Sequence, residues 1–182
     1  VFCASLCDVF EDHPIANETR PRVFDMIRAT PFLDWQLLTK RPERITGNLP
    51  DDWRDGWPNV WLGTSIEDMR VASRADHLRT IPASVRFVSY EPALGPLDDL
   101  NLDGIDWLIY GGESGPGFRP HDLAWPRAMR VRCAELGVAF FFKQSSAPRT
   151  EMGTTLDGET VRKYPRPRIP IPCGRIPLER AA

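Results

Sequence analysis

The sequence of 182 residues predicts an α/β fold, a partial TIM-type (βα) barrel of about six parallel strands. Six short apolar runs each end in polar or charged residues, and helical patterns follow most of them. The runs are continuously apolar, as expected of strands buried on both faces of a parallel sheet. Their starts lie roughly 22 to 34 residues apart, which suits βα units joined by right-handed crossovers. An open doubly wound sheet is the alternative.

The predicted strands are VFCAS (1–5), WQLLTKR (35–41), VWLGTSIED (60–68), VRFVSYEP (85–92), WLIYGGESG (107–115) and VAFFFKQ (138–144). After the first run, Pro21 fits the first turn of a helix. The residues that would share one face of this helix are Val23, Met26 and Ile27. After the second run, Pro42 is expected to begin another helix.

The third helix is predicted to begin after Asp68, whose side chain can cap it. Its apolar stripe consists of Val71, Ala75 and Leu78. The segment PLDDLNLDG (96–104) is too short and too rich in turn residues for a full helix. The last helix is the clearest, because four residues repeat at helical spacing and Gly137 then stands where a C′ glycine ends a helix. These four residues are Trp125, Met129, Cys133 and Leu136.

We divide the chain into a barrel domain (1–147) and an irregular tail rich in proline and arginine (148–182). Within the tail, TTLDGETVRKY (154–164) can form a small hairpin around Asp157 and Gly158. Residues 162–182 carry a net charge of +5, which leaves −7 for the rest of a chain whose total is −2. This basic tail is either a solvated, extended end or a contact for nucleic acid.

Composition excludes several classes of protein. No run approaches the roughly 20 apolar residues of a membrane span, so we expect a cytoplasmic protein. The four cysteines are too few and too scattered for a disulfide framework. Three histidines in separate segments argue against a zinc hydrolase, and no GxSxG elbow is present. The chain opens at Val1 directly in an apolar run, so we expect that the first residues of the natural protein are missing.

Polar residues at the ends of the predicted strands are the candidate site, because the carboxyl ends of barrel strands surround one mouth. The catalytic candidates are Asp8, Glu91 and Lys143. Glu91 precedes Pro92, which favours an extended backbone and a carboxylate that projects from the strand. Lys143 ends the most apolar strand, where it can pair with a carboxylate or simply extend to solvent. The substrate-binding candidates are Lys40, Arg41, Ser65, Glu67 and Gln144.

The segment GGESGPG (111–117) is a glycine-rich loop that follows a predicted strand. Glycines allow backbone N–H groups to close around an anion or the polar end of a cofactor, although a tight turn would also need them. The cofactor-binding candidates are Gly111, Gly112, Glu113 and Ser114. The segment matches neither the Walker loop nor the dinucleotide GxGxxG pattern.

Five motifs in a fixed order carry a resemblance to a known family: LTKRPER (38–44), NVWLGTSIED (59–68), VRFVSYEPALGP (85–96), IDWLIYGGESGPGFRP (105–120) and FFFKQ (140–144). The chain resembles the phage gene-product thirty-seven / sixty-eight family, a group of bacterial and phage proteins of unknown function. That family is similar to radical S-adenosylmethionine barrels, whose members carry a three-cysteine motif. The resemblance implies a [4Fe–4S] cluster and S-adenosylmethionine in the intact protein, and it implies that a first βα unit is among the missing residues.

The cluster ligands themselves are not visible in this chain. Cys3 and Cys7 are spaced CxxxC, but Phe10 stands where a CxxxCxxC loop has its third cysteine. We therefore assign no metal ligand and expect the cluster motif upstream of Val1. On this reading the protein is an enzyme, the glycine-rich loop receives the cofactor, and the rim residues orient a substrate that the sequence does not name.

Two other functions fit the residues. A metal-independent lyase or aldolase would use Lys143 as a Schiff-base amine. A phage-encoded binding module without enzymatic activity would present the basic tail to nucleic acid.

Overall fold

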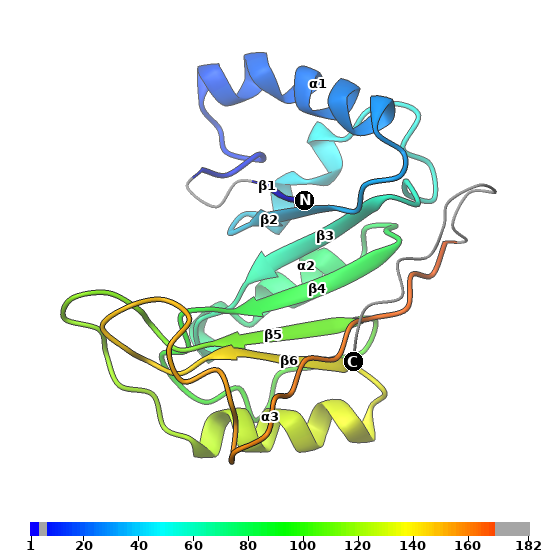
Figure 1. The fold of residues 1–182 in the computed structure, drawn as a ribbon. Helices are drawn as coiled ribbons and strands as arrows, with labels where there is room; N and C mark the ends of the chain where they lie inside the picture. The colour runs from blue at the N-terminus through cyan, green and yellow to red at the C-terminus, as the bar shows by residue number, and fades with distance from the viewer. Residues whose placement is uncertain (4–6, 170–182) are drawn as a thin grey trace.

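Six parallel strands lie side by side in chain order and form one curled sheet, a half-barrel with its helices on the outside (Figure 1). The computed structural model describes residues 1–3 and 7–169. The strands are β1 (Phe2–Cys3), β2 (Trp35–Thr39), β3 (Val60–Ser65), β4 (Val85–Tyr90), β5 (Trp107–Gly111) and β6 (Ala139–Gln144). Spatial order equals chain order, so the sheet lacks the reversal of a doubly wound fold. The predicted partial barrel is confirmed; residues 4–5 of the first predicted strand lie outside the described residues.

The first helix begins earlier than the sequence predicted. α1 (Pro14–Ala29) has Pro14 in its first turn, so Pro21 lies in its interior. The predicted face is also wrong in part, because Met26 is exposed. The buried face consists of Arg20, Phe24 and Ile27. An arginine on this face hid the apolar pattern, and its guanidinium is buried because it donates hydrogen bonds to the carbonyl oxygens of residues 9 and 11.

The other helices follow the predictions more closely. Pro42 begins only the short 3₁₀ helix η1 (Pro42–Arg44), which η2 (Thr46–Asn48) follows. Asp68 accepts a hydrogen bond from the backbone N–H of Arg70 at 2.9 Å and caps η3 (Met69–Val71), which leads into α2 (Ser73–Arg79). α3 (Ala124–Glu135) ends before Gly137, whose φ of 71° is the predicted left-handed conformation.

Two apolar layers lie on opposite faces of the sheet. The larger layer joins the convex face to α1, α2 and α3, and it includes Phe24, Leu78 and Met129 of these helices. The smaller layer lies on the concave face. It consists of Trp61, Val85, Phe87, Trp107 and Ile109, with Leu38, Ala139 and Phe141 packed against them. Both faces of the strands are thus buried, which explains their unbroken apolar sequence.

The chain after β6 returns to the sheet. Leu156 and Glu159 pair across a two-residue turn in which Asp157 and Gly158 both have positive φ, as the predicted hairpin requires. Residues 161–163 then run antiparallel to β6, with the N–H of Phe142 donating to the carbonyl of Val161 at 2.8 Å. Residues 161–163 and Arg168 therefore contact the barrel through their backbone, although most side chains of residues 161–169 are exposed. Residues 170–182 of the basic tail lie outside the described residues.

None of the helices in residues 1–3 and 7–169 is both long enough and apolar enough to cross a lipid bilayer.

Candidate functional site

The concave face changes character along each strand. On β4 the inward side chains are Val85 and Phe87 at the amino end, and Ser89 and then Glu91 at the carboxyl end. On β3 the apolar Trp61 gives way to Ser65 in the same direction. Because side chains alternate along a strand, every second side chain points to this concave face. The apolar layer thus ends where the polar rim begins.

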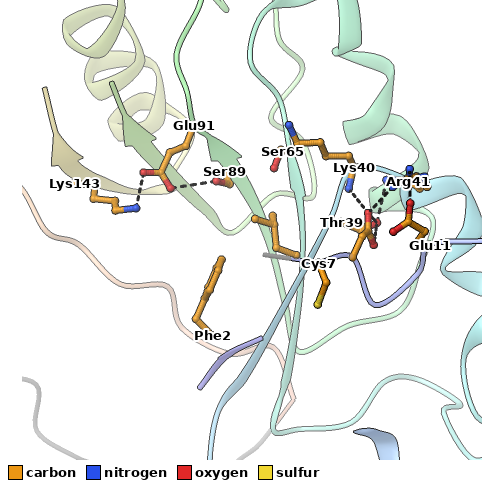
Figure 2. Close-up of a pocket in the computed structure, with 12 residues that line it drawn as sticks. Phe2, Cys7, Glu11, Thr39, Lys40, Arg41, Ser65, Ser89, Glu91 and Lys143 are labelled. Atoms are coloured by element: carbon orange, nitrogen blue, oxygen red, sulfur yellow. Dashed lines mark hydrogen bonds and ion pairs between the residues drawn. The ribbon is translucent and has the colours of Figure 1, made fainter. Parts of the chain in front are cut away.

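The polar rim surrounds a cleft of about 550 Å³, within the usual range for ligand sites (Figure 2). The structure brings six of the predicted site residues together on its walls: Asp8, Lys40, Arg41, Ser65, Glu91 and Lys143. Figure 2 shows the Glu91 and Lys143 pair at one side, Lys40 and Arg41 at the other, and two serines between them.

Glu91 and Lys143 meet across a glycine. Lys143 Nζ lies 3.0 Å from Glu91 Oε1, although their strands, β4 and β6, are separated by β5. At the same height β5 has Gly111, and a Cβ atom there would lie 2.1 Å from Glu91 Oε1. The missing side chain is therefore what lets the carboxylate extend over β5. Ser89 Oγ donates to the other carboxylate oxygen at 3.3 Å.

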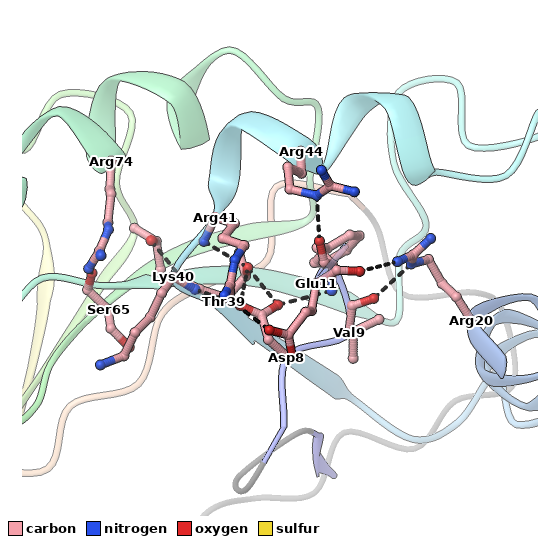
Figure 3. Close-up of polar contacts among 12 residues, drawn as sticks. Asp8, Val9, Glu11, Arg20, Thr39, Lys40, Arg41, Arg44, Ser65 and Arg74 are labelled. Carbon is pink, nitrogen blue, oxygen red and sulfur yellow. Dashed lines mark hydrogen bonds and ion pairs between the residues drawn. The ribbon is translucent and has the colours of Figure 1, made fainter. Parts of the chain in front are cut away.

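Asp8 is the centre of the second polar group (Figure 3). Its carboxylate accepts hydrogen bonds from Thr39 Oγ1 at 2.7 Å and from the backbone N–H of Lys40 at 3.0 Å. It also accepts from the backbone N–H of Phe10 at 2.9 Å, and it pairs with Arg41 at 3.2 Å. These donors occupy the carboxylate and attach the segment after β1 to the end of β2. The contacts favour a positioning role for Asp8, and its predicted catalytic role stays untested.

Glu67 joins two cations beside the cleft. Its carboxylate pairs with Lys40 Nζ at 2.5 Å and with Arg74 of α2 at 2.9 Å. The same arginine nitrogen donates to the carbonyl of Ser65 at 2.8 Å. Glu67 lines an adjoining depression rather than the main cleft. Sequence reasoning missed Arg74, because nothing in a helical sequence shows that its side chain reaches back to the preceding strand.

The predicted cofactor segment lines a shallower depression of about 330 Å³. This depression shares Glu91 and Lys143 with the main cleft, and its other walls include Gly112, Glu113, Ser114 and Gln144.

Several groups of this segment already have partners inside the protein. A Cβ atom on Gly112 would lie 2.2 Å from the backbone nitrogen of Ser146, so this glycine allows two backbone segments to meet. Glu113 accepts three hydrogen bonds from Arg119, at 2.5–2.8 Å, which lower the pKa of its carboxyl to about 2. Gln144 is buried and donates to the carbonyl of Gly112. These contacts favour roles in shaping the loop, and the predicted ligand roles stay untested.

The cleft also contains residues that sequence reasoning passed over. Phe2, Cys7, Thr39 and Ser89 line it. Ser89 had a usable signal, because it lies two residues before Glu91 and must face the same side of a strand. Phe2 had none, since β1 shows its inward face only through its pairing with β2, and Cys7 was considered only as a cluster ligand.

The described residues do not fit an iron–sulfur cluster. Within residues 1–3 and 7–169 no group of three histidine, cysteine or acidic side chains could hold a metal ion. Cys3 packs against the apolar layer of the convex face, whereas Cys7 lines the cleft on the concave side.

The geometry also bears on the Schiff-base alternative. An amine of this kind is activated by a desolvated pocket or by a neighbouring cation. The side chain of Lys143 is 48% exposed and pairs with a carboxylate. This environment does not favour the lyase or aldolase reading.

Comparisons with known proteins give one result. No curated protein and no solved structure matches the chain. A protein-family profile described as "Protein of unknown function (DUF5131)" matches residues 1–165, which includes all six strands and the hairpin after them. This is the family that the five sequence motifs indicated. The chain belongs to the DUF5131 family, the phage Gp37/Gp68 family.

Proposed function

We propose that this protein is an enzyme whose active site is the cleft at the carboxyl ends of the strands, and that its chemistry is of the radical S-adenosylmethionine type. One observation carries the first part. Side chains as far apart in the chain as Asp8 and Lys143 line a single cleft at the end of a parallel barrel where active sites are found. The second part is supported by the family resemblance.

The two neighbouring depressions suit two ligands. The main cleft would hold the substrate between Lys40 and Arg41 on one side and Lys143 on the other. The shallower depression would hold S-adenosylmethionine against Gly112, Glu113 and Ser114. Glu91 and Lys143 belong to both depressions, so they would lie where the two ligands meet.

The protein's own residues would bind and orient the substrate. Lys143 can donate a hydrogen bond to a substrate oxygen while Glu91 fixes the direction of its ammonium group. The hydroxyls of Ser65 and Ser89 are buried between the charged groups and can take either a donor or an acceptor. When bound, the cofactor would supply the radical chemistry. The described residues offer no ligand set for a cluster.

Anaerobic reconstitution of the full-length protein with iron and sulfide tests the radical proposal. We expect visible absorption typical of an iron–sulfur cluster, and release of 5′-deoxyadenosine when S-adenosylmethionine and a reductant are added. The absence of both would reject the radical chemistry.

A binding measurement tests the cofactor site separately. We expect equilibrium dialysis to show binding of S-adenosylmethionine that Ser114→Tyr blocks and that Arg130→Gln, a change on the outside of α3, leaves unchanged. Equal binding by both variants would place the cofactor elsewhere.

A further inference from the structure

Most ion pairs around the cleft and its two adjoining depressions share an orientation, in which the acid is less exposed than the cation. In five of them the carboxylate side chain is 12–25% exposed and the cation is 41–84% exposed. These pairs are Asp8–Arg41, Glu67–Lys40, Asp68–Arg70, Glu91–Lys143 and Glu113–Arg119. We call their cations the rim cations. Five acids balance the charge of the five rim cations. The cations are the more exposed partners, so a molecule that approaches the mouth of the cleft contacts them first.

Several ion pairs elsewhere have the opposite orientation. The acid is the more exposed partner in Arg44–Asp12, Arg79–Asp76 and Arg130–Glu159. Arg168–Asp106, at the amino end of the sheet, has the orientation of the rim. Glu11, the second partner of Arg41, is as exposed as the arginine. The grouping of five outward cations is therefore a feature of the mouth and not of every surface ion pair.

The loops explain why the acids lie inside. Asp68 accepts the backbone N–H of Arg70, Glu113 accepts the backbone N–H of Arg119, and Asp8 accepts two backbone N–H groups. The loop N–H groups hold these three carboxylates against the chain, whereas the side chains of the five rim cations donate to no backbone carbonyl within the described residues. The cations are thus left on the outside.

The rim cations keep unused donors. The Nη1 atoms of Arg70 and Arg119 donate no hydrogen bond within the described residues, and the ammonium groups of Lys40 and Lys143 each contact a single carboxylate oxygen. An ammonium has three N–H donors and a guanidinium has five. Each of these cations can therefore bind an anionic oxygen without releasing its acid.

The rim cations are too widely spread for one phosphate group. Lys40 follows β2 and Lys143 lies on β6, four strands away, which is about 19 Å along the sheet. A single phosphate can touch one part of this arc, whereas a chain with regularly spaced phosphates can touch several.

The cleft inside the arc suits one base. Phe2 lies half exposed on its wall and offers a face for stacking. Ser65 is 3% exposed and lies on the wall of the cleft, where its hydroxyl can donate to or accept from a base (Figure 2). We propose that the rim binds single-stranded nucleic acid, with phosphates on the rim cations and one nucleotide in the cleft. This inference rests on the proposed function, because it makes the strand the substrate of that active site.

The test is fluorescence anisotropy with a labelled single strand of about 12 nucleotides, a length typical of such sites. The rim variant is Lys40→Gln with Arg70→Gln. The matched control is Arg127→Gln with Arg130→Gln, which removes the same charge from α3. We expect the rim variant to weaken binding about tenfold and to make the dependence of log affinity on log salt shallower by about 0.7 for each phosphate that it no longer binds. The control should change the affinity less than about twofold.

Each outcome of this experiment either supports or overturns the inference. Equal weakening by both variants, or no binding by the unmodified protein, overturns the inference. Displacement of the strand by an equal concentration of one mononucleotide would mean that a single nucleotide is recognised. Displacement by heparin with the same dependence on the rim variant would mean that any polyanion is accepted. Rim-dependent binding without deoxyadenosine formation would leave this inference intact and reject only the proposed chemistry.

Discussion

The two ends of the concave face are built from the same strands and differ in almost every other respect. At the amino end Trp61, Phe87 and Trp107 form a buried apolar layer. Residues 163 and 164 lie against this layer, where Tyr164 packs on Trp107 and the indole N–H of Trp107 donates to the carbonyl of Lys163 at 2.9 Å. At the carboxyl end the same inward positions carry serines and charges around an open cleft.

On each strand, residues at the amino end stabilise the apolar layer, and residues a few positions further along line the cleft. At the amino end, residues 163 and 164 cover part of the apolar layer. The carboxyl end keeps its charged groups in fixed positions through ion pairs and loop hydrogen bonds, so that they need little rearrangement when a ligand arrives. We expect four measurable consequences of this difference between the two ends, and the first of them is the strongest.

Trp107→Ala should have the largest effect on stability. Trp107 is 4% exposed and packs against Trp61, Phe87 and Phe141, so its removal leaves a cavity in the apolar layer. We expect a loss of about 3–5 kcal/mol in the free energy of unfolding, measured by urea denaturation. Ser89→Ala, an equally buried position at the other end, should cost about 1 kcal/mol. Similar losses for both variants would contradict the division between the ends.

Gly111→Ala should disturb the polar end. The added Cβ would lie 2.1 Å from Glu91 Oε1, so the carboxylate must leave its position beside Lys143. We expect the free energy of unfolding to fall by about 1–3 kcal/mol and ligand binding in the cleft to be abolished. Gly47→Ala is the matched control, because nothing lies within 4 Å of a Cβ there. If both variants behave alike, the absent side chain at Gly111 is not what allows Glu91 to reach Lys143.

Tyr164→Ala should expose the apolar layer at the amino end of the strands without unfolding the protein. The ring of Tyr164 lies 5.6 Å from those of Trp107 and Phe141 and is 42% exposed. We expect a loss of about 1 kcal/mol, together with faster hydrogen exchange at the N–H groups of Phe142 and Lys163, which donate to the carbonyls of Val161 and Phe140. Unchanged exchange would show that residues 161–163 do not protect β6.

Acid should weaken the polar end first. Arg119 holds the pKa of Glu113 at about 2, below its usual value of 4.5, so the pair stabilises the fold fully above pH 4.5. This contribution is lost as the pH falls from 4.5 towards 2. Since the side chain of Arg119 is 61% exposed, solvent screens the pair, and the effect should be the smallest of the four. The unfolding free energies of the unmodified protein and of Glu113→Gln should differ at pH 6 and converge at pH 2. A difference that does not depend on pH would contradict this account.

Much of the fold could be predicted from local patterns. The runs at β2 to β6 were found because their apolar residues are continuous, and α3 was found because Met129 and Cys133 share a face that ends at Gly137. The start of α1 could not be found in the same way, since Arg20 on its buried face owes its burial to carbonyl oxygens of residues 9 and 11. A helical pattern records only apolar burial.

The candidate site, like the fold, was predictable from the sequence only in part. Its members were predictable because they follow strands, and parallel strands place their carboxyl ends on one edge. The partners of Glu91 were not predictable, because Lys143 lies two strands away and the contact depends on an absent side chain at Gly111. The main cleft and the shallower depression that share this pair were equally invisible.

Local sequence patterns specify the succession of strands and helices along the chain, since each apolar run and each turn residue acts within a few residues of itself, whereas the order of the strands in the sheet came from the structure. Tertiary structure alone decided which acid meets which cation, that the cations face outwards, and that residues 163 and 164 cover part of the apolar layer. These outcomes depend on the curl of the sheet and on contacts between residues far apart in the chain, such as Arg168 and Asp106, which are 62 positions apart. No local pattern carries that information.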